Sequence, residues 1–163
     1  HLRGRGRHEV CRGADLLPEL TKTFDIIHLC GKGNLDEGLQ NRTDYKQFEY
    51  VSDGLNDLFA AADFVVSRAG SNSISEFLAL KKPSLLIPLS ARASRGDQIL
   101  NAASFEKQGF ARVLDEDEMT AETMKKEIFA LYENKEKYVA AMEKSLAGDG
   151  VAAVMTQIKA LMR

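Results

Sequence analysis

The sequence predicts an α/β fold in which a parallel sheet carries helices on both faces. Short apolar runs alternate with longer segments whose apolar residues recur every three or four positions. The runs are apolar throughout rather than at every second residue, which is typical of strands buried on both faces. Because the connections are brief, successive strands are expected to be parallel and joined by helices, as in a doubly wound sheet.

The predicted elements follow one another in a regular order. Strands are expected at residues 24–30, 48–51, 63–67, 83–89 and 111–114. Helices are expected at residues 14–22, 35–39, 54–62, 71–80, 95–109, 119–134, 135–147 and 150–162. Ligands of doubly wound sheets bind beyond the carboxyl ends of the strands. The segments in which to search for a site are therefore 31–34, 51–54, 67–75 and 88–98.

The composition is that of an ordinary globular domain. The chain has 163 residues, of which 44% are hydrophobic and 28% charged, enough for one domain with a core. The net charge of −2 argues against binding to nucleic acid or anionic lipid. Cys11 and Cys30 form no CxxC pair, which favours a reducing compartment without a disulfide framework or zinc site. No apolar run reaches the roughly 18 residues of a membrane span.

The stretch SRAGSNSISEF, residues 67–77, has two interpretations. Ser73 and Glu76 have the spacing of a capping box, in which each side chain bonds the backbone N–H of the other residue. Alternatively the stretch binds a ligand. Gly70 would then allow a close approach of the backbone or a positive φ, and the helix N-terminus would face a diphosphate. The carboxylate of Glu76 could accept two hydrogen bonds from a ribose diol.

The segment 88–102 is a long polar loop that leads into a helix. Asp97 and Gln98, at the start of this helix, offer several acceptors and two donors for adjacent sugar hydroxyls. The alternative is that Asp97 only caps the helix while Gln98 is exposed. Arg92 and Arg95 are expected to face solvent.

Other patterns are weaker. The stretch CGKGN at 30–34 is not a Walker motif, because Ile26 replaces the first glycine and Gly33 the final Ser or Thr. The three histidines form no metal or triad pattern, and His28 is expected to be structural. The acidic run DEDE at 115–118 is expected to be a solvated turn. Residues 1–12, which hold four arginines, are either a basic arm or the end of a fragment or a shifted reading frame.

Two segments, ADFVVSRAGSNSISEFLALKKPSLLIPL (62–89) and DQILNAASFEKQGFA (97–111), closely resemble the C-terminal half of the MurG family, glycosyltransferase family 28. The resemblance implies a Rossmann-like domain, the donor-binding half of a two-domain GT-B glycosyltransferase. Such enzymes transfer N-acetylglucosamine from UDP-N-acetylglucosamine to lipid I, with inversion, to form lipid II of peptidoglycan. The expected division is an atypical arm at 1–12 and a UDP-sugar-binding domain at 13–163.

The resemblance also implies roles for individual residues. Val51 would bind the uracil through its backbone, and Glu76 the ribose hydroxyls. The N-acetylglucosamine hydroxyls would be read by Asp97 and Gln98, with Asn101 in the same motif. The loop under the nucleotide would consist of Ser67, Arg68, Ala69 and Gly70.

The family pattern is incomplete in this chain. Family members have a Gly-Gly-Ser-x-Gly-Ala loop at a place corresponding to residues 1–12, where HLRGRGRHEVCR stands. The acceptor domain, which would supply the catalytic base, the lipid I site and the membrane contact, is also expected to be missing. We therefore expect no catalytic residue in this chain, no cofactor beyond the donor substrate and no protein-bound metal. The intact protein is expected at the cytoplasmic face of a bacterial plasma membrane.

Three alternatives remain open from the sequence. The chain could be a stand-alone UDP-sugar-binding subunit completed by a partner chain. It could belong to another GT-B enzyme, such as a UDP-N-acetylglucosamine 2-epimerase or a glycolipid synthase. It could also be a degenerate fragment that folds without a function.

Overall fold

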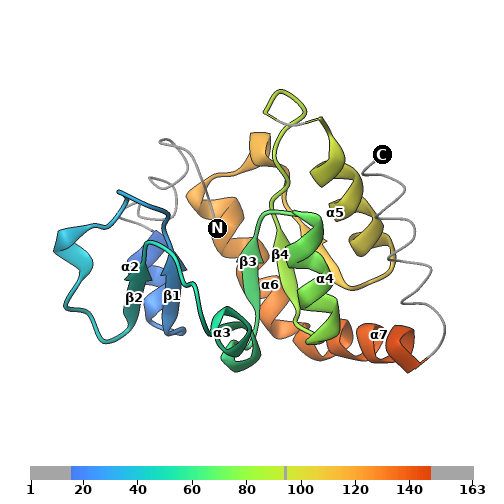
Figure 1. The fold of residues 1–163 in the computed structure, drawn as a ribbon, viewed down its shortest axis with the longest axis horizontal. Helices are drawn as coiled ribbons and strands as arrows, with labels where there is room; N and C mark the ends of the chain where they lie inside the picture. Colours follow the sequence, from blue (N-terminus) through green and yellow to red (C-terminus); the bar gives the residue numbers. More distant parts are fainter. Residues whose placement is uncertain (1–15, 94, 148–163) are drawn as a thin grey trace.

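The structure is a computed structural model that describes residues 16–93 and 95–147 (Figure 1). The predicted arm at 1–12 and the predicted helix at 150–162 lie outside these residues. In chain order the elements are α2 (Leu16–Thr21), β1 (Ile26–Leu29), η1 (Glu37–Leu39), β2 (Tyr45–Phe48), α3 (Leu55–Ala61), β3 (Val65–Ser67), α4 (Ser71–Ala79), β4 (Ser84–Leu86), α5 (Asp97–Lys107), β5 (Ala111–Val113), η2 (Glu116–Glu118), α6 (Ala121–Glu133) and α7 (Lys135–Ala147).

The prediction for β2 was wrong. A strand was expected at 48–51, but β2 is the segment YKQF that ends at Phe48. In this strand Tyr45 is buried while Lys46 is exposed, and Tyr45 is in register with Ile26 of β1. The strand therefore buries only one face, and Lys46 and Gln47 make it more polar than the segment 48–51, which the sequence pattern favoured.

All strand pairs in the described residues are parallel, as predicted. They form two sheets rather than one, with the orders β1-β2 and β3-β4-β5. Figure 1 shows β1 lying between β2 and the second sheet. A common doubly wound sheet has the strand order 3-2-1-4-5-6. Strands β2, β1, β3, β4 and β5 correspond to positions 3, 2, 4, 5 and 6 of that order, and none of the described strands corresponds to position 1.

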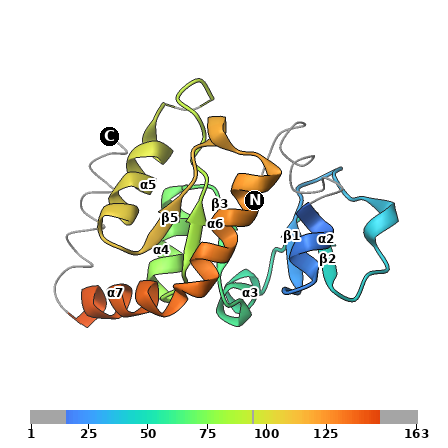
Figure 2. The ribbon, with the colours of Figure 1, turned by 180° about the vertical axis from the view of Figure 1, so that it is seen from behind.

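Helices cover both faces of the β3-β4-β5 sheet, which confirms the predicted layering. In Figures 1 and 2, which view the molecule from opposite sides, α4 and α5 lie on one face and α6 on the other. Helix α5 packs against β5, and α6 packs against both β4 and α2.

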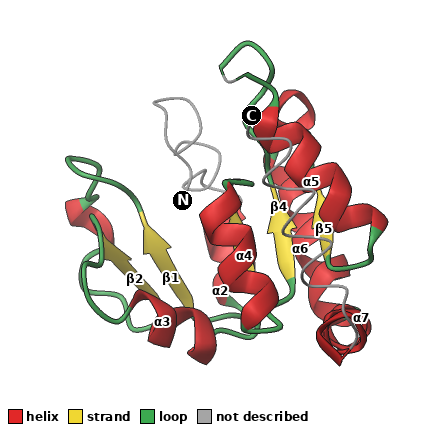
Figure 3. Ribbon diagram, turned by 45° about the vertical axis from the view of Figure 1, so that its right-hand side comes forward, coloured by secondary structure: helices red, strands yellow, loops and turns green. Residues whose placement is uncertain are grey.

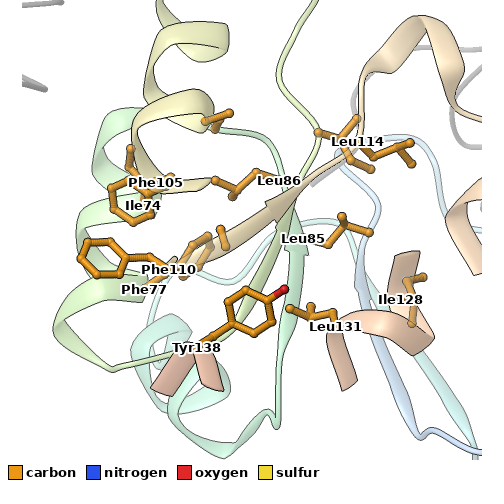
Figure 4. Close-up of a cluster of buried hydrophobic side chains, with 14 of the residues drawn as sticks. Ile74, Phe77, Leu85, Leu86, Phe105, Phe110, Leu114, Ile128, Leu131 and Tyr138 are labelled. Atoms are coloured by element: carbon orange, nitrogen blue, oxygen red, sulfur yellow. The ribbon is translucent and has the colours of Figure 1, made fainter. Parts of the chain in front are cut away.

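Strand β4 is the centre of the core. Leu85 and Leu86 are both fully buried although they point to opposite faces of the sheet. Figure 4 shows Leu86 on the side of Ile74 and Phe105, whereas Leu85 points toward Leu131 and its neighbours on α6. The apolar run of this strand therefore fills both layers.

Replacing Leu85 by Ala is expected to lower the free energy of unfolding by about 3 kcal/mol, because the cavity would open between closely packed layers. Denaturant unfolding of the purified chain measures this change. Leu80→Ala is the control, since Leu80 is 37% exposed at the end of α4, and it should cost less than about 1 kcal/mol. Equal losses in the two variants would contradict the central place of β4.

Candidate functional site

The segments that leave the carboxyl ends of the strands begin at one edge of the molecule. Parallel pairing places the ends of β3, β4 and β5 side by side, and Figure 3 shows β1 and β4 pointing the same way. We call this region the exit edge. It consists of the segments 30–36, 49–54, 68–70, 87–93, 95–96 and 114–115. The predicted binding residues lie in these segments, at the end of β3 or in the first two turns of α4 and α5.

The turn after β3 is short and mostly buried. The carbonyl of Ser67 accepts a hydrogen bond of 2.8 Å from the N–H of Ile87, and Ala69 is fully buried. Gly70 has φ −66° and ψ 140°, so of the two alternatives expected for it, a close approach of the backbone or a positive φ, the second does not occur. A Cβ atom at Gly70 would meet nothing within 4 Å. The space beside this residue is therefore open to a closely approaching group.

Helix α4 begins earlier than a capping box at Ser73 and Glu76 requires. Gly70 is its N-cap and supplies no side-chain hydrogen bond, so the capping-box interpretation is wrong. The first hydrogen bond of the helix runs from the N–H of Ile74 to the carbonyl of Gly70. The N–H groups of residues 71–73 consequently have no acceptor within the helix and lie at the exit edge, where they can bind an anion.

Glu76 lies in the second turn of α4 and is half-buried. Within residues 16–93 and 95–147 its carboxylate makes no hydrogen bond or ion pair. Its acceptor oxygens thus remain available to a ligand near the exposed amides of the helix.

Arg68 is held by the protein itself. Its guanidinium donates hydrogen bonds to the carbonyls of Ile87 and Pro88, at 3.0 and 3.5 Å. It also forms an ion pair of 2.7 Å with Glu116, and both side chains are about nine-tenths buried. The expectation of a solvated turn at 115–118 was therefore wrong for Glu116. Sequence reasoning missed this residue, although it follows β5 at the same edge at which Arg68 follows β3.

Gln98 fixes the loop after β4. Its Oε1 accepts a hydrogen bond of 3.0 Å from the N–H of Leu89, and its side chain is half-buried rather than exposed. Asp97 is the first residue of α5 but does not cap it, because Gly96 with φ 85° is the N-cap and no side chain bonds there. Arg92 and Arg95 are exposed, as predicted.

Asn101 joins α5 to the turn after β3. It is 2% exposed, and its Nδ2 donates a hydrogen bond of 3.1 Å to the carbonyl of Ala69. The amide oxygen is also buried and has no hydrogen-bond partner in the described chain. The turn after β3 is therefore linked to α5 through Asn101 and to the loop after β4 through Arg68.

The structure does not join Val51 to this group. Val51 is half-buried in the segment after β2, and among the described residues no hydrogen bond joins it to Glu76 or Gln98. Nearby, Gly33 has a positive φ of 75° and donates its N–H to Glu49. His28 is bonded to the hydroxyl of Tyr45 at 2.7 Å, in keeping with a structural role. No cluster of three or more His, Cys, Asp or Glu residues that could hold a metal occurs among the described residues.

Comparison with known proteins places the chain in a family. A model of the glycosyltransferase family 28 C-terminal domain matches residues 10–158. The chain belongs to this family. The resemblance read from the motifs at 62–89 and 97–111 is thereby confirmed.

Close relatives carry one name. The protein of Geobacillus thermodenitrificans is 57% identical over 143 residues, and that of Clostridium perfringens is 54% identical over 144 residues. Each match covers 88% of this chain. Both are UDP-N-acetylglucosamine–N-acetylmuramyl-(pentapeptide) pyrophosphoryl-undecaprenol N-acetylglucosamine transferases. The chain spans about 40% of the length of these relatives.

Solved structures show the same fold at low identity. The glycotransferase of kitacinnamycin matches with a TM-score of 0.68 and 19% identity, over 99% of this chain and 37% of its own. Glycosyltransferase VinC, in complex with dTDP, matches with a TM-score of 0.54 and 18% identity, over 74% of this chain and 26% of its own. These likenesses confirm the Rossmann-like α/β fold of a GT-B C-terminal domain.

Replacing Asn101 by Ala is expected to lower the free energy of unfolding by about 2 kcal/mol, because the carbonyl of Ala69 would lose its buried partner. Urea unfolding measures the change. The control is Asn72→Ala on the exposed side of α4, which should stay within about 0.5 kcal/mol of the unmodified chain. If the two variants were equally stable, the link between α5 and the turn would be of no consequence.

Proposed function

We propose that this chain is the donor-binding half of an inverting glycosyltransferase. The donor is UDP-N-acetylglucosamine, and the intact enzyme transfers its sugar to lipid I to form lipid II in peptidoglycan synthesis. The names of the relatives support this reaction, and the GT-B fold supports a nucleotide sugar as the ligand. The acceptor would bind to the part of the relatives that this chain does not span.

The arrangement of α4 carries the proposal. Three N–H groups without helical acceptors, at 71–73, lie at the exit edge beside the open space at Gly70. One turn further, Glu76 presents a carboxylate without an internal partner in the described chain. Amides suit a diphosphate and a carboxylate suits a vicinal diol. A nucleoside diphosphate has both groups at neighbouring positions.

The other proposed contacts are with the uracil and the hexose of the same ligand. Val51 would hold the uracil through its backbone, while Asp97 and Gln98 would contact the hexose hydroxyls. The backbone of the turn at 67–70 would lie under the nucleotide. Asn101 would act by supporting this turn, and Arg68 by holding the backbone at 87–88, since their side chains bond the protein.

The chemical step is an attack by an acceptor hydroxyl on the anomeric carbon, with UDP as the leaving group. The amides at the start of α4 would stabilise the charge that develops on the diphosphate. We propose that the base that removes the hydroxyl proton lies outside this chain. The chain by itself would then bind the donor without turning over lipid I.

We further propose that the intact protein works at the cytoplasmic face of the bacterial plasma membrane. No helix among the described residues has both the length and the apolar character needed to cross a bilayer. We propose that the membrane is contacted by the acceptor domain, in the part of the relatives that this chain does not span. Co-purification with a separate chain that carries an acceptor domain would favour the alternative of a binding subunit.

Titration calorimetry with UDP-N-acetylglucosamine, UDP-glucose and UDP tests the proposed ligand. UDP-N-acetylglucosamine, like UDP-glucose, is expected to bind more tightly than UDP, because its hexose hydroxyls would reach Asp97 and Gln98. A chelator such as EDTA should leave its affinity unchanged, since no protein-bound metal is proposed. Equal affinity for the three ligands, or no binding at all, would count against the assignment.

Glu76→Gln is expected to lower the affinity for UDP about tenfold, because an amide accepts the diol hydrogen bonds less well than a carboxylate. The stability of the chain should change little, since the carboxylate has no partner to lose among the described residues. Glu106→Gln, on the exposed side of α5, is the control and should bind UDP normally. A variant at position 76 that binds UDP as tightly as this control would remove Glu76 from the site.

A further inference from the structure

Four successive residues after β4 are held by side chains from other elements. The carbonyls of Ile87 and Pro88 accept hydrogen bonds from Arg68, which follows β3. The N–H of Leu89 is bonded to Gln98 of α5. The N–H of Ser90 is bonded to Oε2 of Glu116, which follows β5, at 3.0 Å. This backbone is therefore fixed from three directions at the exit edge.

Glu116 connects these contacts. One carboxylate oxygen lies 2.7 Å from the guanidinium of Arg68, and the other accepts the N–H of Ser90. A carboxylate is the group that can accept from two different donors at once while neutralising a buried cation. An amide in its place would present an NH₂ group to one of these donors, which would disrupt the contact.

The orientation of Gln98 depends on the same backbone. The N–H of Leu89 is a donor, so only the amide oxygen of Gln98 can face it. The Nε2 group is thereby directed away from Leu89, with its two donors available to a ligand. A shift of residues 87–90 would release this constraint and let the amide rotate.

We propose that Glu116 is a positioning residue for sugar recognition. By holding Arg68 and Ser90 it fixes the backbone at 87–90, and through Leu89 it sets the amide donors of Gln98 toward the hexose of a nucleotide sugar. This inference rests on the proposed function. It adds Glu116 as a residue that acts on the ligand only through Gln98. Loss of Glu116 should therefore weaken recognition of the sugar much more than recognition of UDP.

The test compares Glu116→Gln with Glu118→Gln, which makes the same change of charge at an exposed position of η2. Affinities of the full chain for UDP-N-acetylglucosamine and for UDP are measured by titration. Glu116→Gln is expected to lose about tenfold in the ratio of the two affinities, the effect of one hydrogen-bonded group. Glu118→Gln should keep the ratio of the unmodified chain.

A double-mutant cycle with Gln98→Ala separates positioning from general damage. If Glu116 acts through Gln98, Glu116→Gln should change the ratio no further once Gln98 has been removed. A merely structural role would lower both affinities together and would persist in the Gln98→Ala background. Either of those results overturns the inference while leaving the proposed function intact. Failure of the unmodified chain to bind either ligand overturns both.

Amide hydrogen exchange of the unmodified chain provides a test that does not depend on a variant's folding. The N–H groups of Leu89 and Ser90 should exchange more slowly than those of the exposed Ala91 and Arg92. Glu116→Asp, which keeps the charge on a shorter side chain, should speed exchange at Ser90. Unprotected exchange at Ser90 in the unmodified chain would refute the role of Glu116.

Discussion

The burial of β4 between two parallel neighbours determines where the polar residues of the site can lie. Its leucines fill the layers on both faces, so the strand cannot slide or turn without exposing one of them. Parallel pairing with β3 and β5 then brings three strand ends to the same edge. Arg68, Ser90 and Glu116 follow those ends and meet although 48 residues separate the first from the last.

The elements with strong apolar patterns were predictable from the sequence, and the exceptions have physical reasons. The segment 83–89 is apolar because β4 is covered on both sides, whereas β2 alternates and was placed three residues too late. A capping box at Ser73 matched the pattern but not the start of the helix, which follows Gly70. The box occurs instead at Thr120 and Thr123 of α6. Spacing alone cannot fix the first residue of a helix.

The candidate site was predictable to a different extent for each residue. Loops at the carboxyl ends of parallel strands identified the region, the chemistry of Glu76 and Gln98 near the starts of two helices selected these residues, and the motif resemblance pointed to the same positions. Glu116 was missed because its partners are distant in sequence and its neighbours 115, 117 and 118 are exposed, as in an ordinary acidic turn. Opposite charges placed directly after two strands of one parallel sheet are the signal that would have revealed it.

The separation of the chain into two sheets has a consequence for cooperativity. Most buried apolar side chains belong to the cluster around β3, β4 and β5, whereas Ile27, Phe48 and Tyr50 are more than two-fifths exposed in and beside the β1-β2 pair. A region with few buried contacts unfolds locally at a lower cost in free energy than unfolding of the whole domain. The uracil of the proposed ligand would therefore bind beside the less stable part of the domain, and its binding would reduce local opening there rather than in the β3-β4-β5 part.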